Sequence, residues 1–203
     1  MATQLFLRNT TPATEPFAFT VRDFSTTRGA AQVGLGELMG DPAVDHELHT
    51  TRWVYRVNAF TCSGTITFNW WGWEVAMADN RGFAAIVARY DNSGSFISDV
   101  VAQANANHAD GVELAVGSPG AVRNWTATPT STAFADGDWI VLEVHFDCVG
   151  ACGGAGANEI ISIDGPTAAA SGDSYVTFTE NITEFVAVAA VPRSTPYPQL
   201  LAH

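Results

Sequence analysis

Five consecutive residues, Asp45-His46-Glu47-Leu48-His49, form the densest group of titratable and metal-ligating side chains in this chain of 203 residues. A zinc-protease helix needs two histidines four residues apart, so that both reach one metal ion from the same face. Here the histidines are three apart and precede an alternating apolar segment, where His46 and His49 would point to opposite faces. We therefore expect a surface strand here and no metal.

Two acidic turns could donate oxygens to calcium, which takes six to eight hard ligands. Neither Asp136-Gly137-Asp138 nor Asp164-Gly165 carries the spaced carboxylates of a calcium loop. Turn chemistry explains both, because Asp and Gly favour tight turns. A calcium ion held between loops distant in sequence stays open.

No residue pattern indicates an activated nucleophile. Cys62 has no local catalytic signature, and the chain has no G-x-S-x-G elbow and no glycine-rich phosphate loop. Glu74, Glu143 and Glu180 could form a glycosidase pair only if folding brought two of them together. We expect a protein that is not an enzyme, with no catalytic residues and no cofactor.

The tryptophans are the one ambiguous group. Trp70 falls on the apolar face of an alternating segment and is expected in the core. Trp71 and Trp73 fall on the opposite face with Thr67 and Asn69, a polar setting for large aromatic rings. Such rings anchor a protein interface or stack on sugars. Burial under a neighbouring loop or subunit is the favoured interpretation, and sugar binding is the alternative.

Alternation with a period of two continues to residue 182, in short segments spaced 8–12 residues apart, as the sequence shows. This spacing is typical of an antiparallel β-sandwich or barrel. The segments on either side of Cys62-Ser63-Gly64, within residues 52–74, predict one half-buried hairpin. Residues 139–146 form the clearest strand, with Trp139, Glu143 and His145 on one face.

The charge of -12 excludes several partners. Nucleic acids and anionic membranes both require a basic surface, and this chain has nine arginines and no lysine. No segment has the ~20 apolar residues of a membrane span, and the start lacks the features of a secretory signal. We expect synthesis in the cytoplasm without a signal peptide. Cys148 and Cys152 could close a small disulfide, although free thiols suit a reducing compartment better.

Three regions are expected. Residues 1–50 would form N-terminal strands and an arm integrated with the body, 51–183 the β-sandwich, and 184–203 an extended C-terminal arm, because its prolines prevent sheet pairing. The arms and the outward tryptophans are expected to contact other subunits. The predicted interface residues are Leu5, Phe6, Leu7, Trp71, Trp73, Phe185, Val186, Val188, Tyr197, Leu200 and Leu201.

Three segments, GTITFNWWGWE at 64–74, the run at 124–147 and DGPTAAASGDSYVTFTENI at 164–182, resemble structural proteins of tailed bacteriophages. The opening MATQLFLRNTT is similar to the starts of such proteins. The resemblance implies a jelly-roll sandwich and a role in the virion as a head decoration, cement, tail or fibre component. It supplies no catalytic residues.

A capsid decoration or cement protein is favoured over a fibre, because the chain has no repeats and no heptads. The expected partners are major capsid or tail subunits and further copies of the chain. Carbohydrate-binding modules share the A-x-G-D-x-I pattern that leads into the strand beginning near Trp139. The alternative is therefore a carbohydrate-binding module, or a tail or fibre adsorption protein that contacts host glycans.

Overall fold

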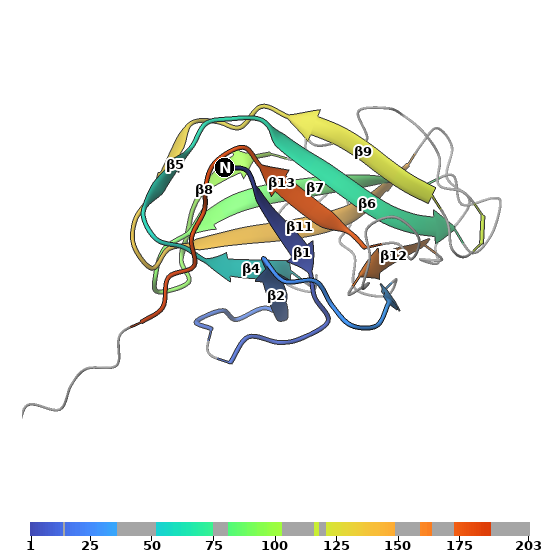
Figure 1. Ribbon diagram of the computed structural model, residues 1–203, viewed down its shortest axis with the longest axis horizontal. Helices are drawn as coiled ribbons and strands as arrows, with labels where there is room; N and C mark the ends of the chain where they lie inside the picture. Colours follow the sequence, from blue (N-terminus) through green and yellow to red (C-terminus); the bar gives the residue numbers. More distant parts are fainter. Residues whose placement is uncertain are drawn as a thin grey trace, which may run out of the picture.

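The computed structural model describes residues 1–13, 15–35, 52–74, 81–102, 116–117, 121–148, 159–163 and 173–187 (Figure 1). Every regular element in these ranges is a β-strand, so the predicted all-β class is confirmed. No helix in the described ranges is long and apolar enough to cross a membrane. The strands are β1 (Thr3–Leu7), β2 (Val21–Ser25), β3 (Val33–Leu35), β4 (Arg52–Arg56), β5 (Phe60–Cys62), β6 (Ile66–Glu74), β7 (Arg81–Tyr90), β8 (Phe96–Val101), β9 (Ala121–Ala127), β10 (Thr132–Phe134), β11 (Trp139–Cys148), β12 (Glu159–Ile163) and β13 (Tyr175–Phe178).

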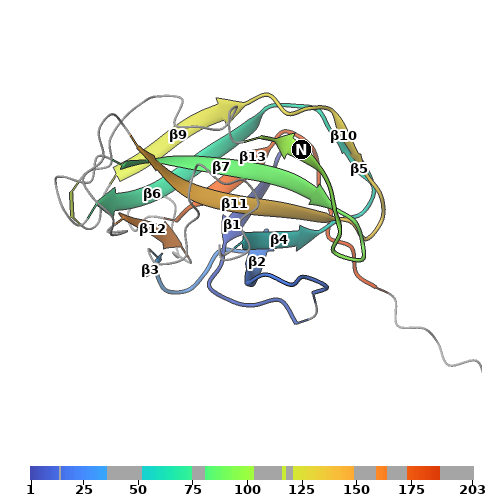
Figure 2. The ribbon, with the colours of Figure 1, turned by 180° about the vertical axis from the view of Figure 1, so that it is seen from behind.

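The strands form a mostly antiparallel sandwich whose two layers are joined at one side. The hydrogen-bonded order is β3-β12-β6-β13-β1-β2-β4-β11-β7-β8, and β9 pairs with β6. β2 pairs antiparallel with β1 and parallel with β4, and so links the layers. Figures 1 and 2 show one layer of β9, β6, β13 and β1, which we call the front layer. The other, the back layer, contains β4, β11, β7 and β8.

The main core lies between these layers. Phe68, Trp70 and Trp125 project inward from β6 and β9 into one buried cluster with Leu142 of β11. The rings of Trp70 and Phe83 meet edge to face, 6.4 Å apart between centroids, and so connect the front layer to β7. The prediction that Trp70 lies in the core is confirmed, with the side chain fully buried.

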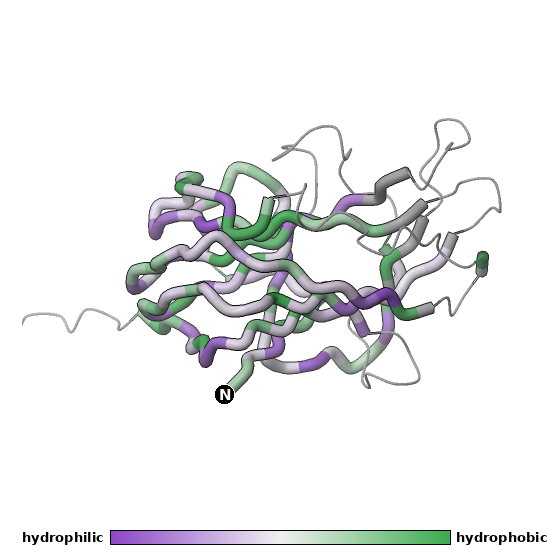
Figure 3. Tube along the Cα trace, turned by 90° about the horizontal axis from the view of Figure 1, so that it is seen from above, coloured by the Kyte–Doolittle hydropathy of each residue, from purple (hydrophilic) through white to green (hydrophobic). Residues whose placement is uncertain are grey.

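The back layer is also covered on its outer side. Val54, Ile86 and Val141 form a second apolar cluster, against which Phe17 and Phe19 pack from the segment before β2. This covering explains why β4 is buried along nearly its whole length. In Figure 3, the layer at the top is coloured more hydrophobic than the layer nearer the N-terminus.

The predicted hairpin within residues 52–74 is wrong. β4 pairs with β11 and β2, whereas β6 pairs with β9, β13 and β12. Between them, β5 pairs with β10 in a separate two-stranded sheet. The alternating pattern assigns a face to each residue, but partner choice depends on contacts between segments far apart in sequence.

The turn between β5 and β6 is held by a carboxylate from the far end of the chain. Glu180 accepts hydrogen bonds from the backbone N–H groups of Ser63, at 2.7 Å, and Gly64, at 2.6 Å. Partial burial opposes ionisation of Glu180, but these N–H groups hold its pKa below the usual value. Cys62, beside the turn, is a free, fully buried thiol.

Two buried acids make the fold sensitive to alkali. Burial, reinforced by Glu180, raises the pKa of Cys62 from 9.0 to about 12. Burial, reinforced by Glu184, raises the pKa of Tyr55 from 10.0 to about 12. Both groups stay neutral in the fold while the unfolded chain ionises, so their stabilisation is full below pH 9 and is lost between pH 9 and 12.

We expect the free energy of unfolding to fall steeply between pH 9 and 12, by up to roughly 4 kcal/mol from Cys62 alone. Urea titrations across this pH range measure the free energy of unfolding. Cys62→Ala is the matched variant, because it lacks the contribution of the thiol. An equal decrease in the free energy of unfolding between pH 9 and 12 in the two proteins would contradict the raised pKa of Cys62. So would rapid reaction of Cys62 with a thiol reagent at pH 8 in a native variant whose Cys148 and Cys152 are replaced by alanine.

Candidate binding face

The outward side of the front layer carries three rows of side chains in cross-strand register. We call these residues, with Trp73 at the end of β6, the outer face. In the first row Val122 lies opposite Trp71, on β9 and β6. The second row runs across four strands, and its members are Asn124, Asn69, Tyr175 and Phe6. The third row runs likewise, and its members are Thr126, Thr67, Thr177 and Gln4.

Most of these side chains are at least partly open to solvent. Asn124, Thr126 and Gln4 are exposed, and Asn69, Trp71 and Tyr175 are partly exposed. Within the described part of the chain, no side-chain hydrogen bond engages Asn69, Asn124 or Tyr175, nor the threonines of the third row. Among the described residues, the face therefore presents amide and hydroxyl groups that no other side chain engages.

None of the outer-face residues carries a charge, in a chain whose net charge is -12. Charged groups stand at the border. The guanidinium of Arg28 lies 4.8 Å from the centre of the Phe6 ring, and its Nε is 3.9 Å from the carboxylate of Asp173. Phe6 in turn contacts Tyr175, with ring centroids 5.4 Å apart. The uncharged surface thus ends at an ion pair.

The structure brings together only some of the predicted interface residues. Trp71 and Trp73 share the outer face as predicted and are partly exposed. Leu5, Phe6 and Leu7 are no more than 5% exposed and are covered by the chain's own strands, so their assignment to an interface is wrong. The N-terminal segment is strand β1 of the body, paired with β13 and β2.

Only two of the predicted C-terminal interface residues, Phe185 and Val186, lie within the described part of the chain. Val186 is 74% exposed, and Phe185 is partly buried over Arg56. Val188, Tyr197, Leu200 and Leu201 lie outside the described residues, as do Asp45-His46-Glu47-Leu48-His49, Asp164-Gly165 and Cys152.

The start of the C-terminal segment is clamped to the end of β4. Asn58 donates from its backbone N–H to the carbonyl of Thr183, at 3.0 Å, and from its amide to the Thr183 hydroxyl, at 2.8 Å. Phe185 donates to the carbonyl of Arg56, also at 3.0 Å, and its ring lies 4.6 Å from the Arg56 guanidinium. We call residues 183–185 the clamped segment.

A cleft of about 450 Å³ lies beside the clamped segment. Its lining includes four aromatic residues, Phe24, Tyr55, Trp139 and Phe185, and three charged ones, Asp23, Arg56 and Glu184. Val186 also lines it, so an exposed apolar side chain stands next to an open cleft whose lining is both polar and apolar.

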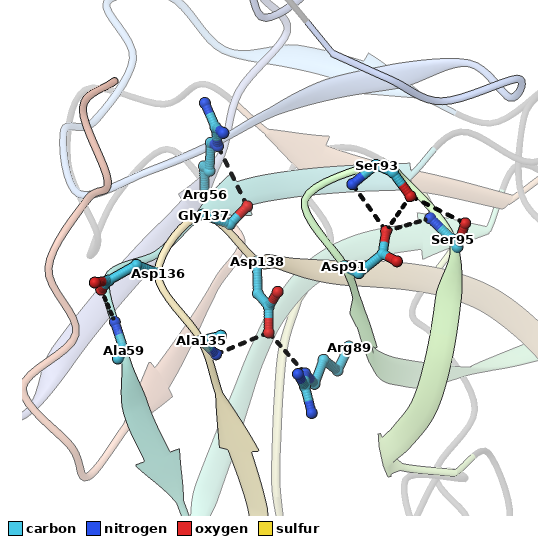
Figure 4. Close-up of polar contacts among 10 residues, drawn as sticks. All are labelled: Arg56, Ala59, Arg89, Asp91, Ser93, Ser95, Ala135, Asp136, Gly137 and Asp138. Atoms are coloured by element: carbon cyan, nitrogen blue, oxygen red, sulfur yellow. Dashed lines mark hydrogen bonds and ion pairs between the residues drawn. The ribbon is translucent and has the colours of Figure 1, made fainter. Parts of the chain in front are cut away.

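The acidic turn at 136–138 serves structure. Asp138 accepts from Arg89 Nε and from the Ala135 N–H, both at 2.8 Å, and Asp136 accepts from the Ala59 N–H at 2.7 Å. Figure 4 shows these carboxylates, and that of Asp91, each directed to its own partners. Among the described residues, no group of three or more ligating side chains could hold a metal ion.

The carboxylate of Glu143 lies inside the protein in a buried polar cluster. Its oxygens are 3.2 Å from Arg52 Nε and 3.2 Å from His145 Nε2. Arg52 also donates to the Tyr90 hydroxyl at 3.1 Å and lies over the Phe19 ring. Arg52, Glu143 and His145 are at most 2% exposed, so no substrate reaches them in this conformation. Glu180 holds the turn at Ser63, and the side chain of Glu74 lies outside the described atoms.

No protein-family model and no curated protein sequence matches the chain. Two crystal structures of a CocE/NonD family hydrolase from Staphylococcus aureus resemble it, with TM-scores of 0.56 and 0.54 and sequence identities of 10% and 11%. Each match covers 88% of this chain and 36% of the hydrolase. At this identity the likeness shows the fold alone, and the chain spans about a third of the hydrolase's length.

We expect Glu143→Leu to lower the free energy of unfolding by about 3 kcal/mol or more, because it removes a partner of the buried Arg52 cation. The double variant Arg52→Met/Glu143→Leu should lose less, since no charge is then left unmatched. Urea denaturation of both variants tests this. A loss below about 1 kcal/mol for the single variant would contradict the structural role of the cluster.

Proposed function

We propose that the protein is a non-enzymatic structural component of a bacteriophage virion, a capsid decoration or cement protein. In this proposal it stabilises the particle by binding neighbouring subunits through its C-terminal segment. The sequence resemblance to tailed-phage structural proteins supports the setting, and the β-sandwich agrees with the jelly roll that the resemblance implies. The hydrolase label belongs to a protein only 10–11% identical, and it assigns no reaction to this chain.

The observation that carries the proposal is the arrangement at the clamped segment. Asn58 and Arg56 hold residues 183–185 against the body, so the chain that follows starts from a defined point. Val186 then presents an apolar side chain, 74% exposed, beside the cleft. An exposed apolar group beside such a cleft is suited to contact another protein surface.

An anchored arm adds contacts at high effective concentration once the body is bound, so small apolar contacts sum to strong attachment. Residues 188–203 include the predicted contacts Val188, Tyr197, Leu200 and Leu201. In this proposal they lie against a neighbouring subunit. The partners are particle proteins or further copies of the chain.

We expect deletion of residues 188–203 to reduce binding to particles of the encoding phage at least tenfold, while the melting temperature of the isolated protein stays unchanged. Cosedimentation with particles that lack the protein measures binding. Asn58→Ala should also weaken binding, because it loosens the clamped segment by removing the side-chain hydrogen bonds to Thr183 and Glu184. Asn181→Ala is the matched control, since Asn181 is an exposed asparagine nearby, with no side-chain hydrogen bond in the described part of the chain.

Unchanged cosedimentation and unchanged heat resistance of the particles after the deletion would rule out attachment through this segment. Equal losses in the Asn58→Ala and Asn181→Ala proteins would show that the clamp plays no part.

A further inference from the structure

We propose that the outer face binds a neutral polysaccharide. The proposal is independent of the C-terminal attachment, because the outer face and the clamped segment share no residue. It assigns a ligand class to a surface that combines partly exposed aromatic rings, amides without side-chain hydrogen bonds in the described part of the chain, and a lack of charge.

The aromatic residues supply the stacking part of such a site. The apolar C–H face of a sugar ring packs on a partly exposed aromatic ring, which provides apolar area and a defined plane. Trp71 lies at one end of the outer face and Tyr175 in the second row, both partly exposed. Asn69 pairs with Tyr175 across β6 and β13, so an amide lies beside the ring in register.

The amides and hydroxyls supply the orienting part. Asn69 and Asn124 lie directly opposite each other, and each amide offers two donors and one acceptor oxygen. Sugar hydroxyls both donate and accept, so they match such groups. Because no side chain engages these amides in the described part of the chain, a ligand that binds them breaks no hydrogen bond among the described residues.

Charge selects the class of polysaccharide. The face itself is neutral, while the protein carries a net charge of -12, so its field repels acidic glycans. A neutral polymer meets no such barrier and requires no counter-charge. Two of the rows cross four strands, and the face runs along β6 from Thr67 to Trp71, so it spans roughly 14 Å by 14 Å at ordinary strand spacings, which accommodates several sugar rings.

A second copy of the chain would fit the outer face less well than a polysaccharide does. Subunit interfaces that stay closed have an apolar centre. Here the second and third rows are dominated by amide and hydroxyl groups, and Val122, 40% exposed, is the most exposed apolar member of the described face. Such a surface stays hydrated by itself and is suited to a ligand that brings its own hydroxyls.

The test is native electrophoresis of the full chain in gels that contain a soluble β-glucan, a galactomannan or starch, with the acidic polymer alginate for comparison. We expect at least one neutral polymer to retard the protein and alginate not to retard it. Trp71→Ala and the double variant Asn69→Ala/Asn124→Ala should each weaken the retardation tenfold or more. Ile97→Ala, at an exposed apolar position on β8 in the back layer, should behave like the unmodified chain.

The double variant Asn69→Ala/Asn124→Ala keeps the proposal testable if Trp71→Ala fails to fold, because it removes no side-chain hydrogen bond found among the described residues. Retardation by no neutral polymer, by alginate alone, or unchanged in both variants would overturn the proposal. A Trp71→Ala protein that changes oligomeric state while no polymer retards the unmodified chain would assign the face to a subunit contact instead. Deletion of residues 188–203 should leave retardation intact, which separates this proposal from the C-terminal attachment.

Discussion

The rest of the structure depends on strand β6, which is hydrogen-bonded along both edges. β9 pairs with one edge, and β13 and β12 share the other. A slip of one residue would move Phe68 and Trp70 out of the core and would break the register with every neighbour at once. The same constraint that buries these rings therefore turns Asn69 and Trp71 outward. The core and the outer face are two consequences of one register.

The faces of the strands could be predicted from the sequence, but their partners could not. Alternation placed Trp70 inward, and Trp71 and Trp73 outward, because a period of two is a local property. The hairpin predicted around Cys62 failed because Arg52–Arg56 and Ile66–Glu74 each find partners far along the chain. Likewise, no local pattern shows that Phe17 and Phe19 cover the outer side of the back layer, which makes Glu143 a buried group.

The candidate site could be predicted only where it lies on one strand. Thr67, Asn69 and Trp71 share a segment, so their common face was visible in the sequence. Asn124 and Tyr175 join them through pairings that no spacing reveals, although each alternates correctly within its own strand. The prediction for Leu5, Phe6 and Leu7 failed because an apolar strand near a terminus reads as an arm until its partners are known. The clamp at Asn58 likewise depends on a residue 125 positions away.

We propose that the outward side of β6 is the ligand-binding side of the molecule, and NMR of the indole N–H groups and the asparagine side-chain amides tests this most directly. Addition of a neutral oligosaccharide should shift the signals of Trp71, Asn69 and Asn124. The indole signals of Trp70, Trp125 and Trp53 should not shift. The indole nitrogens of Trp70 and Trp125 are buried, and that of Trp53 donates a hydrogen bond to the carbonyl of Arg8. Shifts confined to Trp139 at the C-terminal cleft, or no shift at Trp71, would contradict the account.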